Sequence, residues 1–212
     1  MRVPDGDVFI HAGDLCRGGE VDELDLAARW LASLPHPTKV VVAGNHDWAF
    51  VKSPAEAQRI LGPTVVYLQD SGVLLGGLRF WGSPWQPEFN DWAFNLPRGP
   101  SLREKWALIP TDTDVLVTHS PPHGIGDGGG PGDGGYGGKH RLGCEDLRAR
   151  VLEVRPMLHL FGHIHDSGGA WPIGATTFAN VTTWECERGP TVFDIDVPLR
   201  RATAVSVPPA KR

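Results

Sequence analysis

Four apolar runs in this chain each stop at a group of polar residues. The most apolar run, residues 39–43, is followed by Gly-Asn-His-Asp at residues 44–47. The other three runs and their polar ends are 8–12 before Gly13 and Asp14, 115–118 before His119, and 157–161 before Gly-His-Ile-His at 162–165. Runs of branched apolar residues predict strands buried on both faces of a parallel sheet. Ligands bind beyond the carboxyl ends of such strands, so we expect a functional site there.

The rest of the pattern alternates helices and strands, which predicts a layered α/β fold. Apolar residues at helical spacing predict helices at 20–34, 53–61, 101–109 and 144–155, and Ser-x-x-Glu capping boxes open the second and third. Shorter strands are predicted at 65–68, 73–75 and 78–81, the last two joined through Gly76 and Gly77 as a hairpin. The segments 176–180 and 191–197 alternate like antiparallel strands that close a second sheet. We expect residues 1–212 to form one domain.

Two long loops carry unusual compositions. Residues 81–94 are rich in aromatic residues and proline, and a packed surface loop is favoured over the wall of a substrate pocket. Residues 124–138 are so rich in glycine that we expect a mobile loop, either a lid over the strand ends or a disordered insertion.

Charge and composition narrow the class of partner. The net charge is −5 with a pI near 6.0, and Lys and Arg are scattered, so no nucleic-acid footprint or anionic-membrane surface is indicated. No apolar stretch reaches the length of a membrane span, and we expect no signal peptide, because residues 1–6 break into a turn instead of a charged and then apolar run. Three cysteines without zinc-type spacing favour a reducing cytoplasm and small buried apolar roles. A small molecule is the expected partner, and exposed Trp85 and Trp92 would favour a homo-oligomer.

The polar strand ends form a mixed oxygen and nitrogen ligand set: Asp14, Asn45, His119, His163 and His165. Such a set suits Mn, Fe, Zn, Ni or Co better than Ca or Mg. Gly162 lets the backbone turn, so that His163 and His165 can serve two adjacent metals bridged by Asp14. Two such metals can clamp a phosphate and generate a hydroxide nucleophile. His46 is then free to protonate the leaving oxygen.

The order of these motifs resembles the calcineurin-like metallophosphoesterase family. The segments 10–14, 67–70 through Trp85 to 95–99, and 118–122 look like its branch of metallophosphoesterase-domain-containing proteins. The resemblance implies a four-layer α/β/β/α sandwich of two mixed sheets and a metal-dependent phosphoesterase acting on phosphodiesters. It further implies that Asp14 bridges two metals, that Asn45, His119 and His163 complete one site, and that His165 joins Asp14 at the other. His46 would contact phosphate and act as general acid, with a metal-bound hydroxide as nucleophile.

One motif of the family is absent. Members carry Asp-x-His on a first strand ahead of the Gly-Asp motif, and this chain contains no Asp-x-His. We therefore expect the sandwich to lack that first strand. Either the start of this chain was placed too late to include the strand, or the strand was lost. The alternative function is a phosphate- or nucleotide-binding metalloprotein that holds one metal and turns over weakly or not at all.

Further polar residues have competing interpretations. Arg17 could neutralise a phosphate or be an exposed loop arginine; His123 could reach substrate, although a loop role is favoured; Asn180 could lie near the site, although a strand-end asparagine is favoured. His11 is three residues before Asp14 on a strand, which places it on the opposite face, where a hydrogen-bonded core histidine is expected. His159 is expected to be buried within its strand rather than to bind metal.

Overall fold

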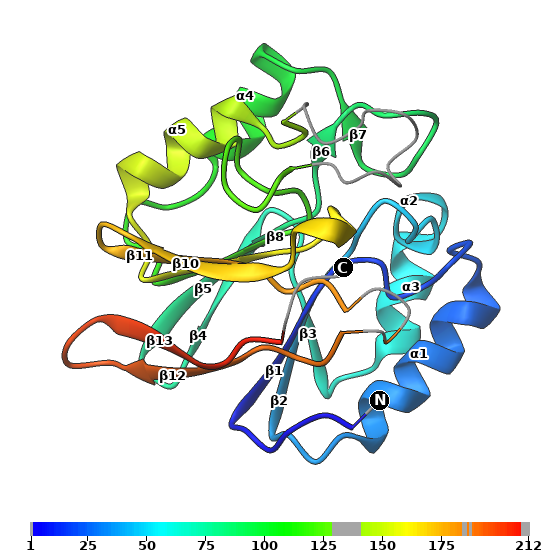
Figure 1. Ribbon diagram of the computed structural model, residues 1–212. Helices are drawn as coiled ribbons and strands as arrows, with labels where there is room; N and C mark the ends of the chain where they lie inside the picture. The colour runs from blue at the N-terminus through cyan, green and yellow to red at the C-terminus, as the bar shows by residue number, and fades with distance from the viewer. Residues whose placement is uncertain (1, 129–140, 184–185, 187, 209–212) are drawn as a thin grey trace.

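The structure is a computed structural model that describes residues 2–128, 141–183, 186 and 188–208. Two sheets stack face to face, and helices cover the outer face of each (Figure 1). The four-layer α/β/β/α sandwich expected from the resemblance is confirmed.

The first sheet contains three parallel strands in the order β1-β2-β3. These are β1 (Val8–Ala12), β2 (Thr38–Val42) and β3 (Val65–Tyr67). Its outer face is covered by α1 (Val21–Ser33), α2 (Ala49–Lys52) and α3 (Pro54–Leu61). Both sheets were expected to be mixed, but the described strands of this one are all parallel. Among described strands, β1 pairs with β2 alone and forms the edge.

The second sheet contains six strands in the order β10-β11-β9-β8-β5-β4. They are β4 (Ser71–Leu75), β5 (Leu78–Ser83), β8 (Val115–Thr118), β9 (Leu158–Phe161), β10 (Gly169–Ile173) and β11 (Thr176–Asn180). The four central strands are parallel, and each edge strand is antiparallel to its neighbour. Helices α4 (Pro100–Ala107) and α5 (Glu145–Val154) cover the outer face.

Burial of β2 explains why its sequence is apolar at every position. Val40 and Val42 pack into the core between the two sheets, whereas Val41 packs between the first sheet and its helices. All three side chains are fully buried. A strand with cores on both faces cannot alternate apolar and polar residues, and the predicted buried strand is confirmed.

The last two strands form a separate hairpin. β12 (Val192–Asp196) and β13 (Arg201–Ser206) pair only with each other among the described strands. The prediction that residues 191–197 close the second sheet is therefore wrong. The reason is that β11 already pairs with β9 on one side and β10 on the other, so neither of its edges is free. The hairpin instead packs Phe193, Ile195 and Ala202 against the core between the sheets.

Local turn signals were predicted with mixed success. The Gly76-Gly77 hairpin is confirmed, with φ of 55° and 82°. Neither capping box forms: the Ser53 side chain makes no cap hydrogen bond, and α4 begins at Pro100, which leaves Ser101 inside its first turn. Proline at the first helical position sets both helix starts, because its missing N–H needs no partner there.

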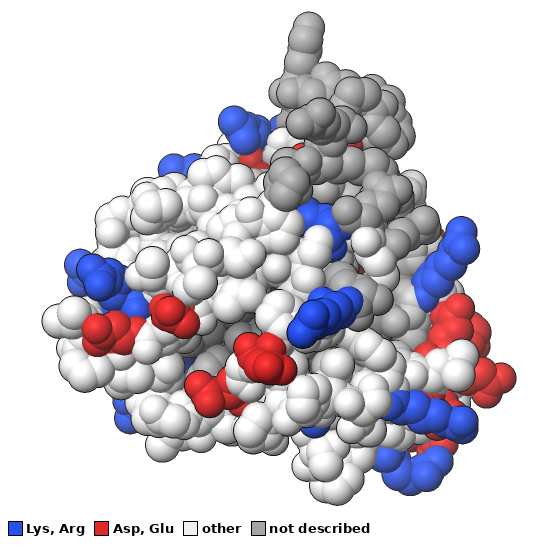
Figure 2. Space-filling model, turned by 60° about the horizontal axis from the view of Figure 1, so that its bottom comes forward, with Lys and Arg blue, Asp and Glu red and all other residues white. Residues whose placement is uncertain are grey.

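Several other expectations can be compared with the fold. Cys16 and Cys144 are buried as expected, but Cys186 is exposed, so the expectation of three buried thiols is wrong. Among the described helices, none combines the length and apolarity required to cross a bilayer. Acidic and basic side chains are interspersed on the face shown in Figure 2. Of the glycine-rich segment 124–138, residues 129–138 lie outside the described part.

Candidate metal centre

The carboxyl ends of four parallel strands bring four polar side chains together. Ligand atoms of Asp14, His119 and His163 all lie within 4.8 Å of one another. Asn45 joins them, because its Oδ1 lies 2.8 Å from His119 Nε2 and 2.9 Å from His163 Nδ1. These residues follow β1, β2, β8 and β9, two strands from each sheet. We call this set of four residues the strand-end cluster.

Two glycines allow the strand ends to approach so closely. Gly13 has φ of 105°, and a Cβ there would lie 2.2 Å from His119 Nδ1. A Cβ at Gly44 would lie 2.3 Å from Asp14 Oδ1. Asp14 and His163 themselves take left-handed conformations, with φ of 59° and 66°. Such conformations cost free energy and gather at functional sites.

The hydrogen bonds of His119 direct a lone pair into the cluster. His119 Nδ1 donates to the carbonyl oxygen of Ala12 at 2.9 Å. A neutral imidazole has one N–H, so Nε2 carries a lone pair that faces the amide oxygen of Asn45. In that tautomer of the neutral ring, Nε2 and Asn45 Oδ1 are two acceptor atoms 2.8 Å apart, and a cation bound by both would satisfy them.

The charge balance of the cluster also suits a cation. Burial acts to raise the pKa of Asp14, but His119, His163 and the backbone N–H of His46 outweigh it and lower that pKa overall. Burial, followed by His119, lowers the pKa of His163 to about 3. The cluster therefore combines a carboxylate with a neutral His163 imidazole, which are the protonation states that metal binding requires.

His46 lies beside the cluster, with one ring nitrogen already engaged. Its backbone N–H donates to Asp14 Oδ1 at 3.0 Å, and its ring Nδ1 donates to the carbonyl oxygen of Arg17 at 2.6 Å. The ring is half-buried and contributes to the electrostatic shift at Asp14 and at His163. Nε2 is therefore the nitrogen available for a proton transfer.

His165 does not join the group of three titratable ligands. It begins the short helix η1 (His165–Ser167), is half-buried, and helps to lower the pKa of His163. Among the described residues, the group that satisfies metal-ligand spacing contains Asp14, His119 and His163. The structure therefore brings together four of the five expected ligands.

Asp47 is a supporting residue that the sequence interpretation missed. Its fully buried carboxylate accepts hydrogen bonds from the backbone N–H groups of Leu15, Cys16 and Gly44, at 3.2, 2.9 and 2.7 Å. Burial and the nearby Asp14 raise its pKa to about 6. Asp47 thus ties the loop that carries Asp14 to the loop that carries Asn45. Its place in the Gly-Asn-His-Asp motif was the available signal.

The structure assigns surroundings to the three candidate substrate residues. The Arg17 side chain is exposed, and its carbonyl holds His46. His123 Nδ1 lies 3.4 Å from Glu145 Oε1 and 4.0 Å from Asp127 Oδ2, at the start of α5. Asn180 is fully buried: its Nδ2 donates to the carbonyls of Gly126 and Ile164, and its Oδ1 accepts from Thr182 N–H. Asn180 therefore braces the backbone beside His163 and His165, because its amide is occupied by backbone groups.

The two histidines expected in the core differ from each other. His159 is fully buried, as expected, and burial lowers its pKa to about 3. His11 packs near Phe9 and Trp30, and burial lowers its pKa to about 4. The Nδ1 atom of His11 has no hydrogen-bond partner among the described residues, so the expectation of a hydrogen-bonded ring is not met at that atom.

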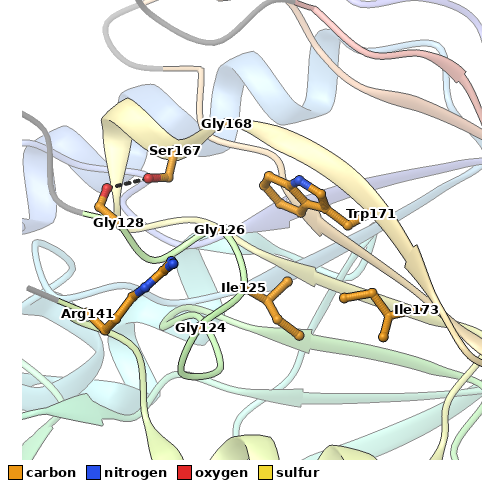
Figure 3. Close-up of a pocket in the computed structure, with 9 residues that line it drawn as sticks. All are labelled: Gly124, Ile125, Gly126, Gly128, Arg141, Ser167, Gly168, Trp171 and Ile173. Carbon is orange, nitrogen blue, oxygen red and sulfur yellow. Dashed lines mark hydrogen bonds between the residues drawn. The ribbon is translucent and has the colours of Figure 1, made fainter. Parts of the chain in front are cut away.

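A cavity of about 420 Å³ opens next to η1 (Figure 3). Arg141 lies at its polar end, where Ser167 hydrogen-bonds the carbonyl of Gly128, and Trp171 and Ile125 line its apolar part. Arg141 is already paired with the buried carboxylate of Asp127 at 3.0 Å. The cavity lies outside the strand-end cluster.

The sequence of this chain is similar to those of known metallophosphoesterase proteins. The family described as calcineurin-like phosphoesterase matches residues 2–167. Metallophosphoesterase domain-containing protein 1 of Homo sapiens is 38% identical over 227 residues, covering 93% of this chain and 67% of that protein. A UPF0046 protein of Caenorhabditis elegans is also 38% identical, over 89% of this chain and 66% of that protein. The chain thus spans about two thirds of these relatives.

A solved structure shares the fold. The phosphopantetheinyl hydrolase of Mycobacterium tuberculosis aligns with a TM-score of 0.54 at 15% identity, over 85% of this chain and 80% of that chain. The oxygen and nitrogen donors of the strand-end cluster fit a divalent metal ion, and the family binds such ions. With its matching sequence, its sandwich fold and this cluster, the chain belongs to the calcineurin-like phosphoesterase family.

Proposed function

We propose that this chain is a metal-dependent phosphodiesterase in which His46 is the general acid. The observation that supports the proposal is the convergence of Asp14, Asn45, His119 and His163, with the His46 ring alongside. These four residues would hold one divalent transition metal ion such as Mn, Fe, Zn, Ni or Co, and Asp14 with His165 would contribute to a second. When bound there, such an ion would polarise the phosphoryl group and lower the pKa of water.

The residues of the chain would divide the remaining work. Asp47 would keep the two ligand loops in register, and the Arg17 carbonyl would hold the His46 ring so that Nε2 faces the substrate. In its doubly protonated form, with Nδ1–H held by the Arg17 carbonyl, the His46 ring would give the Nε2 proton to the leaving oxygen as the P–O bond to that oxygen breaks, which leaves the ring neutral. A phosphodiester carries a single negative charge. Asp14 is the one carboxylate of the strand-end cluster, and the amide of Asn45 and the imidazoles of His119 and His163 add no negative charge that would repel it.

Hydrolysis of diphenyl phosphate with added Mn²⁺ tests this function, because its phenoxide leaving group is basic enough to depend on a proton from a general acid. His46→Ala is expected to lower kcat by about 100-fold, the usual range for a lost general acid. Asn45→Ala is expected to raise the Mn²⁺ concentration needed for activity. His36→Ala is the matched control, because that ring bonds the Pro4 carbonyl and lies away from the cluster. If His46→Ala matches the parent at saturating Mn²⁺ and Asn45→Ala needs no more Mn²⁺ than the parent, the proposal is wrong.

A second function is a metalloprotein that binds phosphate or a nucleotide without efficient turnover. One observation favours it: the described residues gather one ligand set, and His165 lies outside that group. Metal analysis of the purified protein separates the two functions. A stoichiometry near two metals per chain supports the diesterase, and a stoichiometry near one supports the binding protein.

A further inference from the structure

The loop between β6 (Gln86–Pro87) and β7 (Asn95–Leu96) is built against the strand-end cluster. β6 and β7 pair with each other, and the backbone N–H of Ala93 donates to the carbonyl of Asn45 at 3.1 Å. Ala93 and Phe94 are buried in the core, whereas the preceding Trp92 is half-buried. The loop therefore has a fixed position beside a cluster residue and still leaves one indole partly open to solvent.

Other aromatic residues hold this loop in place. Trp85 donates from Nε1 to Asp70 Oδ2 at 2.8 Å, and Lys105 lies 4.2 Å from the centre of the Trp85 ring. Phe94 packs edge-on against Trp85 at 5.6 Å. Trp85 and Phe94 thus account for the packing of the loop. Trp92 takes no part in these contacts, so loop packing does not explain why position 92 is a tryptophan.

Trp92 lies against the proposed general acid. Its ring centre is 4.3 Å from that of His46, with the planes tilted by 41°. His46 Nδ1 is taken by the Arg17 carbonyl, so its Nε2 is the atom that meets the leaving oxygen. No hydrogen bond joins the Trp92 indole to another residue in the described part of the chain.

We propose that Trp92 is a specificity-determining residue whose indole contacts a planar, aromatic organic group on the ester oxygen that leaves. The inference rests on the proposed function. In that reaction the oxygen of a water molecule bonds to phosphorus, the bond from phosphorus to the leaving oxygen breaks, and the leaving oxygen takes the Nε2 proton of the doubly protonated His46 ring. The proton that the water loses passes to solvent, from which His46 is protonated again. The atoms attached to that oxygen then lie next to His46, which is where Trp92 lies.

The energetics of aromatic contacts set the expected size of the effect. A planar group on an indole gains dispersion and quadrupole contacts that a methyl group cannot make. Stacking of planar groups on aromatic side chains commonly changes affinity by tenfold or more. We therefore expect Trp92 to favour an aromatic over a methyl group by about tenfold, which corresponds to about 1.4 kcal/mol.

Equilibrium binding of two inert phosphonates tests the proposal. Phenylphosphonate and methylphosphonate share a head group, contain a P–C bond that hydrolysis does not cleave, and are titrated calorimetrically with Mn²⁺ present. Trp92→Ala should weaken phenylphosphonate about tenfold and change methylphosphonate less than twofold, and Trp92→Phe should restore most of the difference. Trp171→Phe is the matched control from the cavity of Figure 3. Circular dichroism checks the fold of each variant.

Three results overturn the proposal. The first is equal binding of the two phosphonates by the parent. The second is an equal loss of both in Trp92→Ala, which would mean that Trp92 only positions His46. The third is a selective loss in Trp171→Phe instead, which would assign the aromatic group to the cavity. Binding is read without turnover, so a parent that hydrolyses no diester but still shows Trp92-dependent selectivity contradicts the proposed function and supports only the contact between Trp92 and an aromatic group.

Discussion

Two regions of the six-stranded sheet each hold a buried histidine, and only one of them can hold a metal. His119 follows β8 and His159 lies within β9, and both rings are almost completely inaccessible to solvent. His119 donates through Nδ1 to Ala12 and turns its other nitrogen toward Asn45 and Asp14. His159 instead lies between Phe161 and Phe178. Burial alone therefore does not distinguish a ligand from a core residue.

The hydrogen-bond direction at His159 completes the contrast. The Thr118 hydroxyl donates its one proton to the carbonyl of Ser120, so it must accept from His159 Nε2. The proton of the neutral ring is thus on Nε2, and Nδ1 has no partner among the described residues. In the strand-end cluster, Nε2 of His119 faces the oxygen atoms of Asn45 and Asp14. At His159, the unprotonated Nδ1 has only apolar groups such as Phe161 and Phe178 around its ring. His119 therefore has polar neighbours at both ring nitrogens and can bind a cation, whereas His159 has a polar neighbour at Nε2 alone.

The largest expected effect concerns the carboxylate that supports the strand-end cluster. Asp47→Ala leaves the N–H groups of Leu15, Cys16 and Gly44 without their acceptor. We expect a loss of about 4 kcal/mol in the free energy of unfolding, measured by urea denaturation, because each unsatisfied buried donor costs about 1–3 kcal/mol. Asp47→Asn keeps one acceptor oxygen and should cost less. Equal losses in the two variants would contradict this assignment.

The next effect separates the two histidines by metal affinity. His119→Ala should weaken Mn²⁺ binding by more than about 100-fold. Removing a residue that only hydrogen-bonds a metal ligand already lowers metal affinity by about 10–100-fold, and His119 is itself a proposed ligand. His159→Leu should change it by less than about threefold. Isothermal titration of both variants measures the difference. Comparable losses in the two would show that the contrast between the regions is wrong.

A pH dependence of stability is expected from His159. Its pKa is lowered to about 3 in the folded state, while an unfolded histidine titrates near its ordinary value of 6.5. Between pH 6.5 and 3, His159 therefore binds a proton in the unfolded chain but not in the folded chain. The contribution of neutral His159 to stability is complete above pH 6.5 and is lost as the pH falls. From pH 7 to 5 we expect this residue to remove about 2 kcal/mol.

The measurement compares urea unfolding of the parent and of His159→Leu at pH 7 and pH 5. The parent should lose about 2 kcal/mol more than the variant over that range. Because other groups titrate in both proteins, only the difference between them is assigned to His159. The same loss in parent and variant would contradict the assignment.

The smallest effect tests the residue between the two regions. Thr118→Val removes the hydroxyl that joins His159 to Ser120, next to His119. We expect a loss of about 1.5 kcal/mol in stability, in the range for buried groups that lose a partner, and a change in Mn²⁺ affinity of less than about threefold. Thr118→Ser keeps the hydroxyl and serves as control. A large loss of metal affinity would mean that the two regions are coupled.

Much of the strand-end cluster could be predicted because its signals are local. A buried parallel strand must be apolar along its whole length, and a polar residue directly after it must lie at the sheet edge, so Asp14, Asn45 and His119 could be predicted as neighbours. His163 followed from the same reasoning. The helix starts at Pro54 and Pro100 were less clear, because a Ser-x-x-Glu pattern also occurs where proline alone sets the first turn.

What the sequence by itself determined is therefore the set of strands, their buried faces and the polar residues at their ends, because these depend on spacing along the chain. Only the tertiary structure decided that His119 has a second polar neighbour and His159 has none, that Asp47 ties two loops together, and that Trp92 lies on His46. It also decided that β12 and β13 stand apart, because both edges of β11 are occupied. These contacts join segments distant in sequence, and no local pattern encodes which of them meet.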